Sequence, residues 1–379
     1  MYPWIIAGLI VSLLTACSTL EQLNPFASNA PKMTVLQPFK ATVEMHTLWR
    51  GNVGKSGIYA FSPAVVGSSV FAAGSDGSLV RFNEGKQVWK INSGHTFSGG
   101  VGADEVRVVV GTTKGEILAF SSADGKPLWK AKATSEILSP PVLGDGVVVV
   151  RSGDNRLAAY EESDGKRRWI YQRPTPALSL RSSAPPVIEG KYVFSGFPGG
   201  KLIAVTTSNG AASWDGTVAL PKGTTELDRV ADITSSPVIS GRAICAVAFQ
   251  GRVACFDLSN GNLVWARDIS SAVGLSIDSR HLYVTDDKGA VHALDMASGA
   301  SLWKQDKLLH RRITSPLPFR GMVAVADAQG IVHFLNRDDG SFVARHSTDG
   351  SPVVSTLKNL GSSLLVQTSN GGIFAIGTQ

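Results

Sequence analysis

The sequence has no run of basic residues, although lysine and arginine outnumber aspartate and glutamate by 36 to 30 and the net charge is +6. Because the positive charges are spread along the chain, they indicate a solvated surface and not the concentrated basic footprint of a nucleic-acid-binding protein. The seven histidines show no metal-ligand spacing with cysteines or acids, so we expect no metal site. The run from Gly99 to Gly102 lacks the lysine and the strand-to-helix setting of a phosphate-binding loop.

Long hydrophobic runs are also scarce. Residues 2–16 are almost wholly apolar and uncharged, but this span is too short for a membrane helix and suits the core of a secretory signal. Charged residues make up only 17% of the chain and hydrophobic residues 43%, with 40 glycines. This balance is typical of a compact protein made of short strands and many turns, and it argues against disorder and against a multi-span membrane protein.

What the sequence does contain is an internal repeat. In the copy from Asp287 to Trp303, a tight turn is followed by an alternating strand, a second turn at Gly299 and a closing strand. A tryptophan four residues after the turn glycine recurs at Gly85/Trp89, Gly125/Trp129, Gly165/Trp169, Gly210/Trp214, Gly261/Trp265 and Gly299/Trp303. A seventh copy, at Gly340, has Ala344 in place of the tryptophan. Successive glycines lie 38 to 51 residues apart, which is the period of a four-stranded propeller blade.

The two ends of the chain are predicted to complete one further blade. The segment that ends at Leu48 and Trp49 looks like a closing strand without the rest of its blade. The C-terminal segments 351–354, 363–368 and 372–376 look like three strands without a closing strand. Joining the ends removes open sheet edges and, with seven complete repeats, predicts an all-β fold: an eight-bladed β-propeller of four-stranded antiparallel blades.

Local turn chemistry supports this count. Inner strands are expected to begin at pairs such as Ser315-Pro316 and Ser351-Pro352, because proline is tolerated at the first residue of a strand. The tight turns between second and third strands need positive φ and number eight: Asp76-Gly77, Lys114-Gly115, Asp154-Asn155, Gly199-Gly200, Gln250-Gly251, Lys288-Gly289, Gln329-Gly330 and Asn370-Gly371.

The repeated tryptophans are predicted to be structural. Recurrence once per unit favours packing between adjacent blades over stacking on a ligand, and it applies to Trp49, Trp89, Trp129, Trp169, Trp214, Trp265 and Trp303. Burying roughly 200 Å² at about 25 cal/mol/Å² gives an upper bound near 5 kcal/mol for each ring. Because Ala344 lacks this contribution, we expect a local weak point in the seventh blade.

The N-terminal residues Leu14, Thr15, Ala16 and Cys17 resemble the lipobox of bacterial lipoproteins. This resemblance implies a signal peptide over residues 1–16 and a Cys17 that carries several acyl chains, palmitate among them, enough for stable anchoring. Ser18 after the cysteine implies sorting to the outer membrane. One departure is that no lysine or arginine precedes the apolar core. Residues 17–41 contain three prolines and no sustained periodicity, so we expect a flexible tether there and the propeller over residues 42–379.

The glycine-to-tryptophan repeat resembles that of quinoprotein dehydrogenases, which use pyrroloquinoline quinone. Taken with the lipobox, the tether and the eight compact blades, the whole chain resembles the BamB family, lipoproteins of the outer-membrane β-barrel assembly (BAM) complex. The resemblance implies a scaffold that is not an enzyme and needs no cofactor, held by lipid at the periplasmic face of the outer membrane. It also implies binding to a POTRA domain of BamA, the barrel-forming subunit, and help in folding and inserting outer-membrane proteins, with unfolded clients as candidate partners.

Two long loops are predicted to flank the fourth blade. The distance from the tryptophan to the next inner-strand proline is 11 residues for Trp129, 16 for Trp169 and 23 for Trp214. These outer-to-inner connections emerge on one face of a ring, together with the turn at Gly199. Loops on a rigid scaffold often carry function, so we expect a partner surface here, although tolerated insertions are the alternative.

The resemblance assigns residues within these loops to BamA binding: Leu178, Leu180, Arg181 and Asp232. Two leucines would supply an apolar anchor, and an arginine beside a carboxylate would give direction at the rim. Thr234 departs from the family pattern, which has a second acidic residue at this position.

Two other functions remain as alternatives. A quinoprotein dehydrogenase would need acids and a calcium site in a central pocket. The acids here, such as Asp286 and Asp287, fall mostly in turns and are expected to be solvated, and the vicinal cysteine pair typical of many such enzymes is missing. A periplasmic propeller that binds a small ligand, glycan or peptide would carry polar and aromatic residues on its inner strands, but segments such as 64–66 look like plain core.

Cys245 and Cys255 lie on the two strands joined by the Gln250-Gly251 turn, close to opposite one another. Small buried thiols are the default expectation for such residues. A disulfide in an oxidising periplasm stays open as the alternative.

Overall fold

The computed structural model describes residues 31–378. The predicted signal peptide (residues 1–16) and the predicted lipidation site Cys17 lie outside the described residues. The chain divides into Met1–Met33 and Thr34–Gln379. The second unit contains every strand and is described here by itself.

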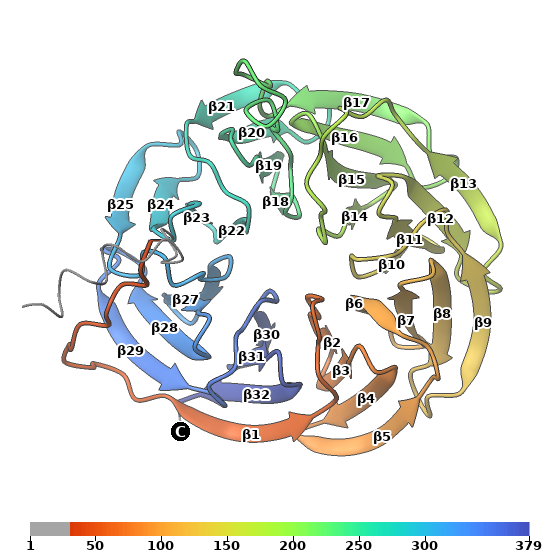
Figure 1. The fold of residues 1–379 in the computed structure, drawn as a ribbon, viewed down its shortest axis with the longest axis horizontal. Helices are drawn as coiled ribbons and strands as arrows, with labels where there is room; N and C mark the ends of the chain where they lie inside the picture. The colour runs from red at the N-terminus through yellow and green to blue at the C-terminus, as the bar shows by residue number, and fades with distance from the viewer. Residues whose placement is uncertain (1–30, 379) are drawn as a thin grey trace, which may run out of the picture. The chain divides into compact units, whose positions relative to one another are not determined.

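Thirty-two strands form eight four-stranded antiparallel sheets, arranged as the blades of a ring (Figure 1), and the described residues contain no helix. Blades one to four are β2 (Ala64–Val66), β3 (Ser69–Ala73), β4 (Ser78–Asn83), β5 (Lys86–Asn92); β6 (Phe97–Ala103), β7 (Arg107–Thr112), β8 (Glu116–Ser121), β9 (Pro127–Lys132); β10 (Val142–Gly144), β11 (Val147–Arg151), β12 (Leu157–Glu161), β13 (Arg167–Tyr171); and β14 (Val187–Glu189), β15 (Tyr192–Phe197), β16 (Lys201–Thr206), β17 (Ala212–Thr217). Blades five to eight are β18 (Val238–Ser240), β19 (Ala243–Val247), β20 (Val253–Asp257), β21 (Leu263–Arg267); β22 (Leu275–Ile277), β23 (His281–Thr285), β24 (Val291–Asp295), β25 (Ser301–Gln305); β26 (Leu317–Phe319), β27 (Met322–Ala326), β28 (Ile331–Asn336), β29 (Phe342–Ser347); and β30 (Lys358–Leu360), β31 (Ser363–Gln367), β32 (Gly372–Gly377) with β1 (His46–Asn52). The prediction of an all-β, eight-bladed propeller is confirmed.

Blade eight is built from both ends of the chain. Strand β1 pairs antiparallel with β32, with His46 opposite Gly377 and Asn52 opposite Gly372. The predicted closure of the ring by the N-terminal strand is therefore confirmed, and the edge of β32 is paired with β1.

One predicted strand start in blade eight is wrong. The inner strand begins at Lys358, not at Ser351. Ser355 donates a hydrogen bond to the Gln367 carbonyl at 3.3 Å, as Ser139 does to the Arg151 carbonyl in blade three, so Ser355 holds the position that marks an inner strand. The Ser351-Pro352 pair belongs to the preceding loop.

The tryptophans pack between neighbouring blades. A Cβ added at Gly165 would lie 2.6 Å from Trp129 Cε3, and one at Gly210 would lie 2.7 Å from Trp169 Cε3, so each turn glycine of one blade is the seat for the ring of the blade before it. Six indole N–H groups donate to the carbonyl three residues before that glycine: Trp89 to Ser122, Trp129 to Glu162, Trp169 to Thr207, Trp214 to Leu258, Trp265 to Met296 and Trp303 to Arg337. The glycine-to-tryptophan spacing of the sequence is thus an inter-blade contact.

Ala344 stands where no such seat exists. Blade eight has no turn between its third and outer strands, because β32 runs to the end of the chain and β1 comes from its beginning. Ala344 is 1% exposed and packs in one cluster with Met45, against which Val43 also lies. The expected weak point in blade seven is therefore filled by residues from the start of the chain.

The two propeller cysteines form a disulfide. Cys245 on β19 lies directly opposite Cys255 on β20, and their sulfur atoms are bonded. Both residues are fully buried between blades five and six. The default expectation of free thiols is wrong, because the antiparallel register places the two side chains on the same face of the blade.

Candidate functional site

The two predicted long loops flank blade four and contact each other. They comprise residues 172–186, between β13 and β14, and residues 218–237, between β17 and β18 (Figure 1). Ser182 Oγ donates to the Thr234 carbonyl at 3.4 Å, and Ser236 Oγ donates to the Pro185 carbonyl at 3.0 Å. The loops therefore form one connected surface, which we call the blade-four surface.

Asp232 is the buried centre of this surface. It is 2% exposed, and its two carboxylate oxygens accept the Leu180 N–H at 2.6 Å and the Gly199 N–H at 3.0 Å. Its own carbonyl accepts the Phe249 N–H at 2.8 Å. One carboxylate thus holds the first loop against the β15–β16 turn, while its backbone holds the β19–β20 turn. Asp232 supports the exposed residues from below and does not pair with Arg181.

A buried arginine lies under the same loops. Arg151 is 4% exposed, and its guanidinium carbon is 5.5 Å from the centre of the Phe197 ring. Burial lowers the pKa of Arg151 to about 10, whereas the negative charge of Asp232 raises it. Arg151 Nη2 donates to Asn155 Oδ1 at 3.0 Å, but Nη1 has no acceptor among the described residues. Asp232 therefore also offsets part of the cost of a buried cation.

The other predicted contact residues lie on the first loop. Leu178 is 44% exposed, whereas Leu180 is half-buried and its N–H is held by Asp232. The Arg181 side chain is 54% exposed and forms an ion pair with Glu136, from the loop between blades two and three. Thr234, in the second loop, is half-buried and donates to the Ala272 carbonyl at 2.9 Å.

Sequence reasoning missed three residues of this surface. Leu220 and Leu227 are exposed apolar side chains of the second loop, and Glu136 is the carboxylate that Arg181 meets. The turn that carries Leu227 is held by reciprocal 3.1 Å bonds between Thr225 and Asp228. This Thr-x-x-Asp pattern resembles a capping box and was the available signal for an ordered turn. Nothing in the sequence places Glu136 beside Arg181.

The arrangement suits protein binding more than chemistry. Exposed leucines with charged side chains at the rim are typical of an interface, and such apolar groups on an ordered loop need little further ordering when a partner binds. Within residues 31–378, no group of three or more His, Cys, Asp or Glu side chains is placed to hold a metal ion. The same part of the chain has no helix with the length and apolarity of a membrane span.

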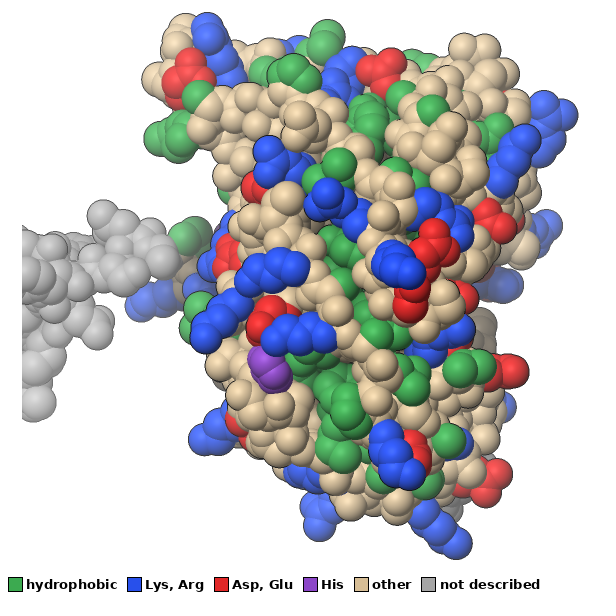
Figure 2. Space-filling model, turned by 90° about the vertical axis from the view of Figure 1, so that its right-hand side faces the viewer, with side chains coloured by type: hydrophobic (Ala, Val, Ile, Leu, Met, Phe, Trp, Pro, Cys, Tyr) green, Lys and Arg blue, Asp and Glu red, His purple; other side chains and the backbone are tan. Residues whose placement is uncertain are grey.

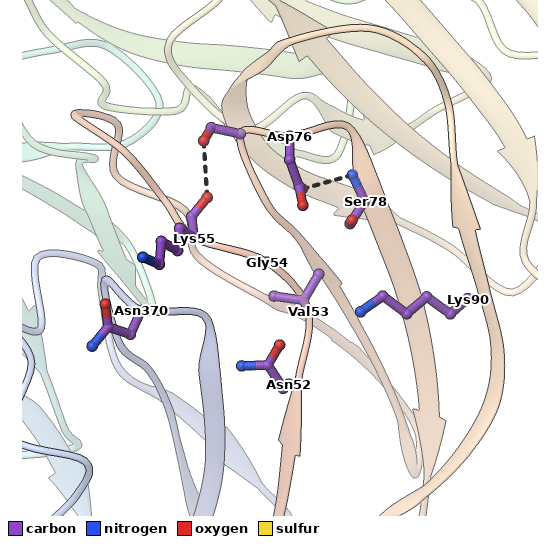
Figure 3. Close-up of a pocket in the computed structure, with 9 residues that line it drawn as sticks. Asn52, Val53, Gly54, Lys55, Asp76, Ser78, Lys90 and Asn370 are labelled. Carbon is purple, nitrogen blue, oxygen red and sulfur yellow. Dashed lines mark hydrogen bonds between the residues drawn. The ribbon is translucent and has the colours of Figure 1, made fainter.

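A cavity lies away from these loops, where blade eight meets blade one. It measures about 610 Å³ and is lined by polar groups that include Lys55, Lys90 and Asn370 (Figure 3). Asp76 is its only carboxylate, and its Oδ1 accepts the Ser78 N–H at 3.0 Å. A single carboxylate that caps its own turn does not make an acid–base pair.

Many acids elsewhere are paired with basic side chains. On the flank with β9 and β13, basic side chains are interspersed with acids (Figure 2), and Lys130 pairs with Glu116 at 2.6 Å. Asp286, which we expected to be solvated, instead accepts a 2.8 Å bond from His292 with both side chains largely covered. Burial raises the pKa of Asp286, but the bonds from His292 and the Ala290 N–H outweigh it, so the pKa is lowered.

Within the described residues, the eight inner strands carry one basic side chain, that of Lys358. The residues that pair with the third residue of each second strand are Ala64, Gly102, Val142, Val187, Val238, Ser276, Leu317 and Lys358. Lys358 is exposed to water, yet protein surrounds it closely enough for desolvation to lower the pKa of its ammonium. Among the described residues no carboxylate lies within ion-pair distance of Lys358.

Comparison with known proteins identifies relatives along almost the whole chain. A family model described as outer membrane protein assembly factor BamB matches residues 75–305. The BamB protein of Bordetella pertussis is 42% identical over 369 residues, covering 96% of this chain and 95% of that protein. That of Escherichia coli K12 is 32% identical over 390 residues, covering 98% of each.

Solved structures agree with this relationship. The crystal structure of BamB from Moraxella catarrhalis matches with a TM-score of 0.82 and 25% identity, covering 88% of this chain and all of that one. The quinohemoprotein alcohol dehydrogenase of Comamonas testosteroni matches with a TM-score of 0.71 but only 13% identity, over 88% of this chain and 77% of that one. The second likeness concerns the propeller fold alone.

Proposed function

The chain belongs to the BamB family of outer membrane protein assembly factors, and from this premise we propose that it is a non-catalytic scaffold of the BAM complex. Its blade-four surface binds a POTRA domain of BamA, and Cys17 carries the lipid that holds it at the periplasmic face of the outer membrane. In this position the protein aids the folding and insertion of outer-membrane proteins.

The observation that carries the proposal is the buried carboxylate of Asp232. Because it fixes the Leu180 N–H and the Gly199 N–H, the first loop is held with Leu178 and Arg181 facing solvent. A preordered loop loses little conformational entropy on binding, so its apolar side chain acts as an anchor and its arginine as a guide at the rim. The carboxylate thereby serves the interface without touching the partner.

Binding between the purified full-length protein in detergent and the POTRA segment of BamA from the same organism tests the proposal. Leu178→Ala and Arg181→Ala are each expected to weaken binding about tenfold, as central interface side chains do. Leu128→Ala is the matched control, because Leu128 is 48% exposed on the outer strand of blade two. Unchanged affinity of both loop variants, with the control behaving alike, would move the interface to another face.

Binding of a small carboxylate in the central channel is a second candidate function, favoured only by Lys358. The quinoprotein chemistry of the fold relatives fits poorly, because the described residues form no three-ligand metal cluster. A citrate titration followed by calorimetry, with Lys358→Met beside wild type, separates this candidate from the scaffold. Heat of binding that Lys358→Met abolishes would support it, whereas no heat in wild type would exclude binding of this probe.

A further inference from the structure

Residues 34–45 lie along the outer side of blade seven. We call this segment the strap; it is the red-to-orange segment that passes β29 before β1 begins (Figure 1). The Thr34 N–H donates to the Leu309 carbonyl at 3.1 Å, and the Thr42 N–H donates to the Val343 carbonyl at 2.9 Å. The strap is therefore bound through its backbone near both ends.

Three side chains of the strap pack on the blade. Leu36 lies against the cluster that contains Trp303, Leu308 and Ile313. The Phe39 ring centre is 5.4 Å from that of Phe342. Val43 packs against the cluster that contains Ala344, where the other blades carry tryptophan. Val35, in contrast, is 76% exposed.

A buried polar chain links the two halves of this contact. Arg311 is 3% exposed and donates to the Thr34 carbonyl at 2.9 Å and to Asp327 Oδ2 at 2.8 Å. Asp327 also accepts a 3.0 Å bond from His333 Nε2, and both residues are fully buried. Because Arg345 Nε donates to His333 Nδ1 at 3.2 Å, the proton of the neutral ring sits on Nε2, facing Asp327.

Arg345 completes the contact at the other end. Its guanidinium carbon lies 4.9 Å from the centre of the Phe39 ring, a cation–π arrangement. Burial lowers the pKa of His333, and it raises that of Asp327; hydrogen bonds from His333, the Ile331 N–H and Arg311 nonetheless bring the pKa of Asp327 down to about 2. The negative charge of Asp327, which attracts both Arg311 and Arg345, thus belongs to blade seven and not to the strap.

We infer that blade seven is an intramolecular binding site for the strap, which acts as a clasp and fixes where the N-terminal chain leaves the propeller. This inference rests on the proposed anchor at Cys17. With the clasp closed, Thr34 lies about 17 residues along the chain from Cys17, a separation that spans at most roughly 58 Å. Release as far as Met45 extends that limit to roughly 95 Å, at about 3.4 Å per residue.

The clasp also sets the direction of anchoring. The strap runs on the blade-seven side of the ring, whereas the blade-four surface lies on another side, beyond blades five and six (Figure 1). A closed clasp fixes the point where the N-terminal chain meets the ring at blade seven, away from the proposed partner surface. The same propeller on a released strap would still bind its partner, but over a wider range of heights and orientations.

Limited trypsin digestion of the full-length protein in detergent tests the clasp. Lys40 is exposed but lies between Phe39 and the bound Thr42 amide, so cleavage after it requires the strap to leave the blade. Phe39→Ala and Arg345→Gln are each expected to speed this cleavage at least fivefold, measured by mass spectrometry. Val35→Ala, the matched control within the strap, is expected to stay within twofold of wild type.

The outcomes separate the clasp from the scaffold function. Faster cleavage with wild-type POTRA affinity in solution supports the clasp, because the blade-four surface is untouched. Wild-type cleavage that is already as fast as that of a free peptide spanning residues 34–45 would overturn it, as would Phe39→Ala cleaved no faster than Val35→Ala. Arg345→Gln keeps the apolar packing, so it provides a test even where Phe39→Ala disturbs folding.

Discussion

Asp232→Asn replaces one buried carboxylate oxygen with an NH₂ group and removes the negative charge. We expect it to lower both the free energy of unfolding and the affinity for the partner. The asparagine oxygen still accepts one N–H, but its NH₂ group faces the other, so about one charge-assisted hydrogen bond is lost at about 1.5 to 3 kcal/mol. Arg151 loses the charge of Asp232 as well. Together these losses lower the free energy of unfolding by about 2 to 4 kcal/mol.

Urea denaturation followed by circular dichroism measures this change, and hydrogen exchange at the Leu180 amide reports the loop directly. POTRA affinity is expected to fall at least tenfold, because the loosened loop must be ordered again on binding. Thr234→Ala is the control: it lies two residues further on and removes one hydrogen bond, at about 1 kcal/mol. An Asp232→Asn protein with the wild-type urea midpoint and unchanged Leu180 protection would refute the role we assign to the carboxylate.

Three further predictions concern the ring itself. Trp169→Ala is expected to cost about 3 to 5 kcal/mol in urea denaturation, because the ring is 7% exposed and its N–H loses the Thr207 carbonyl. Asp327 has a pKa of about 2 in the folded state, below its unfolded value of about 3.9, so its stabilisation is present above about pH 4 and is lost as the pH falls toward 2. Asp327→Asn should therefore lower stability at pH 7 and flatten its dependence on pH between about 4 and 2; an unchanged acid limb would contradict the network. Replacing Cys245 and Cys255 together by alanine is expected to lower the free energy of unfolding by about 2 to 3 kcal/mol under non-reducing conditions. A wild-type protein that is no more stable than this double variant without reductant would mean that the disulfide does not form.

The fold was predictable because its determinants repeat. Blades one to seven each have a turn glycine that seats the tryptophan of the preceding blade, and in blades one to six a tryptophan follows that glycine at the spacing of Gly165 and Trp169. The prediction was less accurate where a signal occurs only once. The Ser351-Pro352 pair imitates an inner-strand start, but the position that hydrogen-bonds the second strand is Ser355.

The blade-four surface was predictable in place but not in detail. Loop length alone locates it, because extra residues between a tryptophan and the next inner strand must emerge on one face. The roles of its side chains depend on contacts between distant segments. Asp232 is separated by 52 residues from the Leu180 amide that it accepts, and Arg181 by 45 from Glu136. No local pattern distinguishes such a buried, supporting carboxylate from an exposed, contacting one.

In a repeat protein the residues that specify the fold recur from unit to unit. Residues that depart from the repeat can therefore have other roles, such as binding a segment of the chain or a partner. Ala344 breaks the tryptophan series where blade eight has no turn to seat a ring, and Val43 of the strap packs against the cluster that contains Ala344. Asp232 belongs to the longest connection between blades, and it orders the surface that we propose for a partner. Both departures lie outside the repeated contacts, and both join segments far apart in the chain. Strap binding and partner binding can therefore be altered separately, since Phe39 packs on blade seven and Leu178 lies in the loop before blade four.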